Sequence, residues 1–244
     1  MQDTGKRRGI LRQLICDETK NQEEKPVKAV IFDMDGVIFD SERATYLCWK
    51  KIAEDHGLAG MDEVYRRCIG VTPEVTRQIC LEAYGEDFPY DSFDKEASAL
   101  FHERYDGGRL PVKEGTREIL TFLKNNGIPT ALASSTRQTR VESQLREAGL
   151  MEFFDVIVGG ESVSRSKPAP DIFLYAAEQL GAAPAGCVVI EDSFNGIRAA
   201  HAAGMIPVMV PDMLEPDDEI RGKCKAVCRT LTEVQRKMEG KDLL

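Results

Sequence analysis

The sequence predicts an α/β fold in which helices cover both faces of a parallel sheet and a helical block is inserted near its start. From residue 114 onward, short apolar runs alternate with longer segments of helical periodicity, which is typical of parallel strands joined by crossover helices. Between residues 45 and 113 no convincing strand interrupts the helical pattern. That block is long enough to have a small core of its own.

The first strand is expected at residues 29–32, where Ala-Val-Ile-Phe is the continuous apolar run of a strand buried on both faces. Asp33, Asp35 and Gly36 follow at its carboxyl end. Residues i and i+2 of an extended chain point to the same side, so the two carboxylates can face one point in space. Like charges held that close repel unless a cation or a proton lies between them. This stretch alone fits a hard-cation site and an ordinary polar strand end equally well.

The remaining elements follow in order, and glycine, proline and asparagine mark most of their ends. Helices are expected at residues 41–57, 62–70, 73–84 and 90–105, and Ser41 is expected to cap the first. The second part is expected to contain helix 115–126, strand 128–133, helix 136–148, strand 155–158, helix 170–180, strand 188–190, helix 194–203, strand 206–210, strand 226–228 and helix 231–238.

Length, charge and cysteine usage narrow the possible functions. The 244 residues, 42% of them hydrophobic, suit one large domain or a core with an inserted subdomain. The net charge of -9 opposes binding to nucleic acid or to an anionic membrane. The seven cysteines are scattered without a Cys-x-x-Cys pair, which disfavours zinc and favours reduced thiols in a cytoplasmic protein. No apolar run approaches the ~20 residues that span a bilayer.

The expected domain organisation has three parts. Residues 1–27 are highly charged and are expected to form an extension that is disordered or loosely packed on the surface, with a short amphipathic helix as the alternative. Residues 28–44 and 114–244 form the α/β core, and residues 45–113 form the helical cap domain. A monomer is expected.

Polar side chains follow four of the expected strands. Ligands of a wound α/β sheet gather beyond the carboxyl ends of its strands, so these side chains are expected to meet there. Each has an ordinary alternative, as a turn serine, a solvated lysine or a helix cap, but their ordered appearance predicts one site. The residues are Asp33 and Asp35, then Ser134 and Ser135, then Lys167, then Glu191 and Asp192.

These residue types point to phosphoryl chemistry. Asp33, Asp35 and Asp192 offer the oxygen ligands that a hard cation such as Mg²⁺ prefers. Lys167 supplies a positive charge for a phosphoryl group. One fixed carboxylate can attack phosphorus, and a second can move the protons that the reaction requires. Phosphate oxygens can be held by the Ser134 hydroxyl and by the main-chain N–H groups of Ser135 and Gly36.

Four segments resemble the four motifs of the haloacid dehalogenase (HAD) superfamily. They are F-D-M-D-G-V-I-F-D-S-E, A-S-S, S-K-P-A-P-D and E-D-S-F-N-G-I-R-A-A, in this order. The resemblance covers residues 28 to about 212 and is closest to the branch of β-phosphoglucomutases and small phosphate-monoester phosphatases. It implies a Rossmann-like doubly wound core with an α-helical cap inserted after the first motif.

The resemblance also implies a role for each motif residue. Asp33 would be the nucleophile and Asp35 the general acid and base, while Ser134 and Lys167 would bind phosphate. Magnesium would be held by Asp33, the Asp35 carbonyl and Asp192, with Glu191 on or beside a metal-bound water. Dehalogenases of the superfamily lack the second aspartate of the first motif, so its presence here favours phosphoryl transfer.

The same comparison favours a phosphatase over a mutase. Where the mutases carry an Arg after a Gly-Val-Ser-like run, this chain has Pro73, and where they carry a His in the first cap helix it has Thr45. Both differences remove groups that would hold or gate a bisphosphate. The expected activity is therefore Mg²⁺-dependent hydrolysis of a small phosphorylated metabolite, a sugar phosphate, through an aspartyl-phosphate.

Two alternatives remain open at this stage. One is a β-phosphoglucomutase-like phosphosugar mutase. The other, more distant, is a non-enzymatic phospho-aspartate receiver domain. The pairing of Asp33 and Asp35 at one strand end and the inserted helical block both oppose a receiver.

Overall fold

The computed structural model describes residues 29–243, and its centre is a six-stranded parallel sheet. The order of the strands is β3-β2-β1-β4-β5-β6, and all five neighbouring pairs are parallel. This arrangement confirms the predicted Rossmann-like fold, whose direction of winding reverses between β1 and β4. The strands are β1 (Ala29–Phe32), β2 (Thr130–Ala133), β3 (Val156–Val158), β4 (Cys187–Glu191), β5 (Ile206–Met209) and β6 (Ala226–Val227). The extension predicted at residues 1–27 lies outside the described residues.

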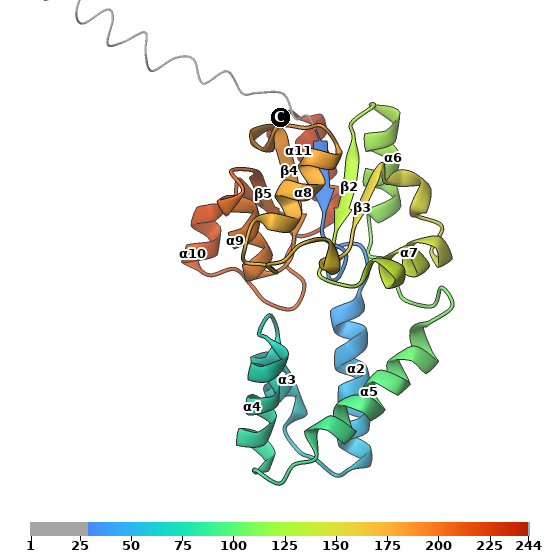
Figure 1. The fold of residues 1–244 in the computed structure, drawn as a ribbon, viewed down its shortest axis with the longest axis vertical. Coiled ribbons are helices and arrows are strands. Elements are labelled where there is room, and N and C mark those ends of the chain that lie inside the picture. Colours follow the sequence, from blue (N-terminus) through green and yellow to red (C-terminus); the bar gives the residue numbers. More distant parts are fainter. Residues whose placement is uncertain (1–28, 244) are drawn as a thin grey trace, which may run out of the picture.

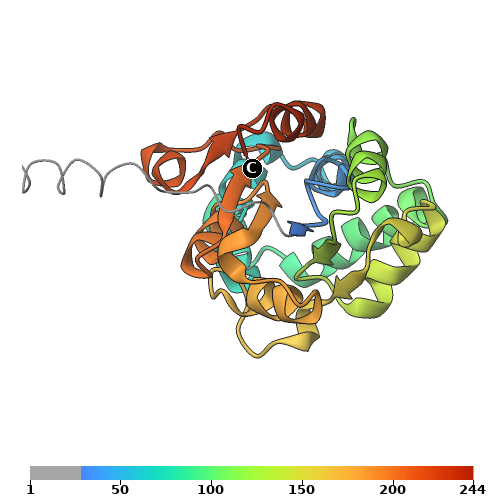
Figure 2. The same ribbon diagram turned by 90° about the horizontal axis from the view of Figure 1, so that it is seen from above.

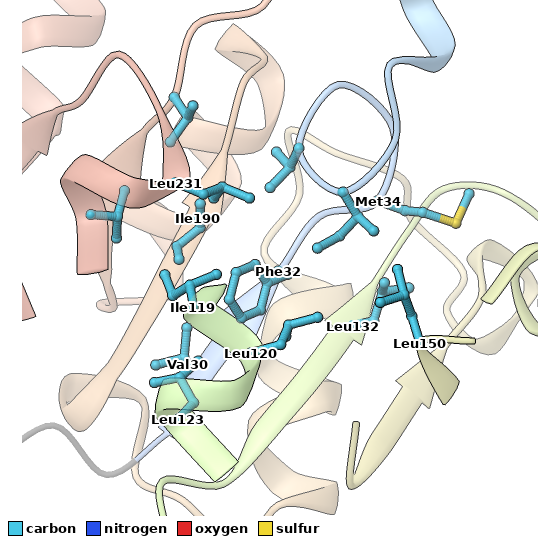
Figure 3. Packing of buried hydrophobic residues seen from close by; sticks show 14 of the residues in the cluster. Val30, Phe32, Met34, Ile119, Leu120, Leu123, Leu132, Leu150, Ile190 and Leu231 are labelled. Atoms are coloured by element: carbon cyan, nitrogen blue, oxygen red, sulfur yellow. The ribbon is translucent and has the colours of Figure 1, made fainter. Parts of the chain in front are cut away.

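The central strand β1 is fully buried because both of its faces are covered. Its side chains alternate, as the pleat requires. Val30 and Phe32 belong to one hydrophobic cluster, and Ala29 and Ile31 belong to the other. Figure 3 shows Val30 and Phe32 among the side chains of helix α6 (Thr116–Asn125). A strand with two buried faces needs the continuous apolar sequence that β1 has.

Helices cover both faces of the sheet, as Figure 2 shows. The cluster that contains Phe32 includes residues of α6, α7 (Gln138–Glu147) and α11 (Leu231–Glu239) as well as residues of the strands. The opposite cluster includes residues of α8 (Asp171–Gln179) and α9 (Phe194–Ala202) packed against the other face of the strands. A short helix, α10 (Asp218–Lys223), packs through Ile220 against α9 and β5. Three 3₁₀ turns complete the core, at Met151–Phe153, Gly160–Ser162 and Pro184–Gly186.

Four helices form a separate layer beyond the carboxyl ends of the strands (Figure 1). They have a hydrophobic cluster of their own, in which the Trp49 ring lies 5.2 Å from the Phe93 ring and 5.5 Å from the Tyr65 ring, centre to centre. We infer that this layer is the predicted cap, and its boundaries at residues 45 and 113 remain a prediction. The helices are α2 (Ser41–Asp55), α3 (Met61–Cys68), α4 (Pro73–Tyr84) and α5 (Tyr90–Tyr105).

Two local details differ from the sequence-based expectations. Helix α10 was not predicted, because a six-residue helix with one buried side chain is too short for a hydrophobic period. Ser41 does not cap α2: it is the first helical residue, and its hydroxyl donates a hydrogen bond to Asp35 instead. Between residues 29 and 243, no helix is long and apolar enough to cross a membrane.

The doubly covered sheet predicts a large cost for cavities in its core. Leu132 of β2 is fully buried, whereas Leu174 of α8 is 38% exposed. We expect Leu132→Ala to lower the free energy of unfolding by about 2–5 kcal/mol, because it removes packed methyl groups and leaves a cavity. Leu174→Ala, the matched control, is expected to cost about 0.5 kcal/mol or less. Equal urea-unfolding midpoints for the two variants would contradict this description of the core.

Candidate active site

A buried ion cluster joins the ends of β1 and β4 to the segment between β3 and α8. The main-chain N–H of Asp33 donates to the Ile190 carbonyl at 3.0 Å, which places Asp33 directly beyond the β1–β4 pairing. The Lys167 ammonium donates to an Asp33 carboxylate oxygen and, at 2.9 Å, to Oε1 of Glu191. The side chain of Lys167 is only 8% exposed, that of Asp33 9% and that of Glu191 1%. Charges this deeply buried persist only when they are paired, as these are.

Burial and the neighbouring charges together shift the pKa values in the cluster. Burial raises the pKa of Asp33 to about 7; Lys167 opposes this shift, and Glu191 and Asp35 add to it. Burial also raises the pKa of Asp192, with further contributions from Glu191 and Asp33. Burial alone would lower the pKa of Lys167, but the neighbouring Asp33 and Glu191 carboxylates hold it above its usual value. One ammonium thus faces three carboxylates, which favours an additional cation.

The carboxylates are placed so that a metal ion fits among them. Asp33, Glu191 and Asp192 each offer an oxygen, and these oxygens lie within 4.8 Å of one another. Oxygens of this kind are preferred by hard divalent cations. Gly36 makes room for this arrangement, because a Cβ built there would lie 2.2 Å from an Asp192 carboxylate oxygen. Its φ of +79° also favours glycine.

Asp35 lies in a different setting from Asp33, although both line the same cavity. Its Oδ1 accepts a hydrogen bond from the Ser41 hydroxyl at 2.7 Å. Its Oδ2 accepts one from the Thr136 hydroxyl at 3.0 Å and a longer one from Ser134 at 3.4 Å. No ammonium is bonded to Asp35 within the described part of the chain, so hydroxyl groups alone fix its orientation.

The other predicted residues gather at the same edge. Ser134 is buried, and its hydroxyl also accepts a hydrogen bond from the Thr136 N–H at 3.0 Å. Ser135 is exposed and lines the cavity together with Asp33 and Lys167. All the residues predicted for the site therefore lie around one point, while their individual roles remain predictions.

Sequence reasoning missed several groups at this site. Because Ser41 was expected to cap a helix, its bond to Asp35 was not predicted, and Thr136 follows Ser135 directly without a spacing that would mark it. The Ser193 hydroxyl accepts from the Gly196 N–H at 3.0 Å and caps α9, while Glu191 and Asp192 of the same segment lie in the carboxylate cluster. No pattern predicted that the Asn195 side chain would donate to the Gly70 carbonyl at 3.1 Å and hold the α3–α4 loop against the core.

Two cavities meet beside Asp35. The larger, about 430 Å³, is lined by Asp33, Lys167 and Asp192 and by the α3–α4 loop; we call it the phosphoryl cavity. The second, about 300 Å³, lies among α2, α5 and α7. Glu42 borders both cavities and accepts a hydrogen bond from the Tyr65 hydroxyl at 2.7 Å. Burial raises the pKa of Glu42, while this hydrogen bond opposes the shift.

The carboxylate cluster predicts that a divalent cation stabilises the protein. A ligand that binds only the folded state raises the thermal midpoint, so MgCl₂ is expected to raise the midpoint of the unmodified chain. Asp192→Asn is expected to abolish most of this gain, because it removes a ligand charge. Asp218→Asn, a change at an exposed position of α10, is the control and should retain the full gain. A full Mg²⁺-dependent gain in Asp192→Asn would show that the ion binds elsewhere.

Comparison with known proteins agrees with this geometry. A phosphorylated carbohydrates phosphatase of Thermotoga maritima is 37% identical over 183 residues, which cover 73% of this chain and 82% of the relative. A β-phosphoglucomutase of Bacillus subtilis is 35% identical over 192 residues, covering 75% and 83%. A fructose-1-phosphate phosphatase of Escherichia coli is 30% identical over 185 residues, covering 74% and 95%.

A solved structure and a family model also resemble this chain. A HAD family hydrolase of Deinococcus radiodurans, solved with bound phosphate and sodium, superposes with a TM-score of 0.76 at 29% identity. The alignment covers 90% of this chain and 98% of that one. Residues 27–204 match the model of the haloacid dehalogenase-like hydrolases. This chain therefore belongs to the haloacid dehalogenase-like hydrolase family.

Proposed function

We propose that this protein is a Mg²⁺-dependent phosphatase that hydrolyses a small phosphate monoester, a sugar phosphate, through an aspartyl-phosphate intermediate. The observation that carries the proposal is the different setting of two neighbouring aspartates in one cavity. Asp33 is bonded to the Lys167 ammonium, as suits a nucleophile that must remain ionised beside an anionic substrate. Asp35 is held by three hydroxyl groups, as suits a side chain that gains and loses a proton.

The proposed reaction has two steps. In the first, an Asp33 oxygen attacks phosphorus, the bond from phosphorus to the ester oxygen breaks, and Asp35 gives its proton to the departing alcohol. In the second, Asp35 takes a proton from a water molecule, which attacks phosphorus. The bond between Asp33 and phosphorus then breaks and inorganic phosphate is released. The hydroxyls of Ser41 and Thr136 keep Asp35 in position for both transfers.

The remaining residues stabilise charge in these steps. Lys167, the Ser134 hydroxyl and the main-chain N–H groups of Ser135 and Gly36 are proposed to hold the phosphoryl oxygens. Mg²⁺ would be held by Asp33, Asp192 and the Asp35 carbonyl, with Glu191 on or beside its water ligand. When bound, the ion would neutralise charge on the phosphoryl oxygens and on Asp33.

The similar proteins support a sugar phosphate as the substrate. Two of them are described as phosphatases of phosphorylated carbohydrates and of fructose 1-phosphate. We propose a small phosphorylated metabolite of this class for the present chain and no nucleic-acid or membrane partner. We further propose a cytoplasmic monomer, which the acidic composition and the free cysteines among residues 29–243 support.

A mutase is the second candidate, because a β-phosphoglucomutase is among the similar proteins. The local structure favours hydrolysis over it. The Thr45 hydroxyl donates to the Ser41 carbonyl within α2 at 2.9 Å, so this position offers no titratable group to the site. Pro73 begins α4 and supplies no cation where a bisphosphate would require one. Conversion of a hexose 1-phosphate into its 6-phosphate, dependent on a bisphosphate, would favour the mutase instead.

The nucleophile assignment is tested by phosphate release from a panel of sugar phosphates. Asp33→Asn is expected to lower Mg²⁺-dependent phosphate release by about 10³-fold or more, because an amide cannot form the acyl-phosphate. Asp218→Asn serves as the matched control and should retain the activity of the unmodified chain. Undiminished activity in Asp33→Asn would refute the proposed nucleophile.

A further inference from the structure

The second cavity lies where the leaving group of the proposed reaction must extend. Asp35 lines both cavities, whereas Asp33, Lys167 and Asp192 line only the phosphoryl cavity. In an in-line displacement, the nucleophile and the leaving oxygen are on opposite sides of phosphorus. The acid that protonates the leaving oxygen lies on the leaving side. If Asp33 attacks and Asp35 protonates, the leaving group points past Asp35 into the cavity among α2, α5 and α7.

The lining of this cavity suits a ligand with several hydroxyl groups. Its side chains include hydrogen-bond donors and acceptors in similar number, and the Trp49 and Phe101 rings provide apolar surface. The polar groups suit neighbouring hydroxyls of a ligand, because each hydroxyl both donates and accepts a hydrogen bond. The rings suit the apolar C–H face of the same ligand. The polar groups concerned are Thr45, Asp94, Ser98, His102, Arg140 and Gln144.

Arg140 is held in place without using up its hydrogen-bond donors. Its guanidinium carbon lies 5.5 Å from the centre of the Phe101 ring, and Nη1 lies 3.4 Å from each ring nitrogen of His102. None of the salt bridges found among residues 29–243 involves Arg140. Two rings therefore orient the planar group, while most of its N–H donors remain available to a ligand in the cavity.

Gln144 adds a second unsatisfied group on the same face of α7. It follows Arg140 by four residues, a spacing that places both side chains one above the other on a helix. Its Oε1 is buried and accepts no hydrogen bond in the described part of the protein. A buried acceptor without a partner costs free energy, which a hydroxyl of a bound ligand would recover.

The charges around the cavity distinguish a neutral ligand from an anionic one. Arg140 is the one Lys or Arg among the described lining residues, which also include the carboxyl groups of Asp35, Glu42 and Asp94. A second phosphate or a carboxylate on the leaving group would be repelled by these acidic groups. A neutral polyol would not be repelled, and it could accept hydrogen bonds from Arg140 and donate hydrogen bonds to the acidic groups.

We propose that the cavity among α2, α5 and α7 binds a neutral, polyhydroxylated leaving group and that Arg140 and Gln144 determine the preference for it. This inference rests on the proposed phosphatase function and specifies its substrate class. The phosphoryl cavity then holds the reacting group, and helix α7 of the core, together with the cap, selects the alcohol. A leaving group without hydroxyls would leave Arg140 and Gln144 unsatisfied and would be disfavoured.

The test compares three phosphate donors with the full-length chain. Sorbitol 6-phosphate has a neutral polyol leaving group, 6-phosphogluconate adds a carboxylate, and acetyl phosphate has no hydroxyls to be recognised. The unmodified chain should show a higher kcat/KM for sorbitol 6-phosphate than for 6-phosphogluconate. Arg140→Met should lower kcat/KM for sorbitol 6-phosphate about 10- to 100-fold, and Gln144→Leu should give a smaller loss of the same kind.

Controls separate recognition from folding and from chemistry. Both variants should hydrolyse acetyl phosphate within about two-fold of the unmodified rate, since a recognition group acts only on the alcohol that it contacts. Arg146 lies on the same helix, and its side chain is 66% exposed. Arg146→Met should leave kcat/KM unchanged for both substrates. Arg140→Lys retains the charge without the planar fork and should recover only part of the loss.

Three results would overturn the inference. Equal losses on sorbitol 6-phosphate and acetyl phosphate in Arg140→Met would show a general structural role, and unchanged kinetics would show that the cavity is not used. A preference of the unmodified chain for 6-phosphogluconate that Arg140→Met abolishes would show an anionic ligand. Failure of the proposed function itself would appear differently, as acetyl phosphate hydrolysis that Asp33→Asn does not reduce.

Discussion

The buried pairing of Lys167 with Asp33 and Glu191 is the interaction on which the site depends. Lys167 lies 134 residues from Asp33 and 24 residues from Glu191 in the sequence, yet its ammonium contacts both carboxylates. Only a parallel sheet that brings the ends of β1 and β4 together, with Lys167 in the segment between β3 and α8, produces this contact. The fully buried β1 supplies the rigid support that such an ion cluster requires.

This cluster explains how the two aspartates can differ in their proposed roles although only Met34 separates them. One ammonium does not balance Asp33, Glu191 and Asp192, and the remaining negative charge makes the place suitable for a divalent cation. Asp35 is bonded instead to hydroxyls of α2 and of the loop after β2, and it is not one of the three carboxylates whose oxygens lie close enough together to share an ion. Asp35 also lines both cavities, which places it between the proposed sites of the phosphoryl group and of the leaving alcohol.

Much of the fold could be predicted because its elements are regular. The predicted bounds of α4 and α5 match the structure, and Pro73 and Gly85 mark the start and end of α4. The predicted site residues also meet, because consecutive strand ends of a parallel sheet share an edge. The groups that orient Asp35 could not be predicted, because contacts between Thr136 or Ser41 and a strand end depend on tertiary packing and follow no sequence period. The same holds for Arg140, which is one of many helix arginines until Phe101 and His102 are placed beside it.

The central claim, that Asp33 receives the phosphoryl group, is tested most directly by mass spectrometry of Asp35→Asn treated with Mg²⁺ and acetyl phosphate. Acetate leaves without needing a proton, so the first step proceeds in this variant, while the second step is slowed because its base is absent. Borohydride then converts an aspartyl-phosphate into a homoserine. We expect this conversion at Asp33, in the tryptic peptide of residues 29–43, which Lys28 precedes and Arg43 ends. Conversion at another residue, or hydrolysis that continues with Asp33 unmodified, would contradict it.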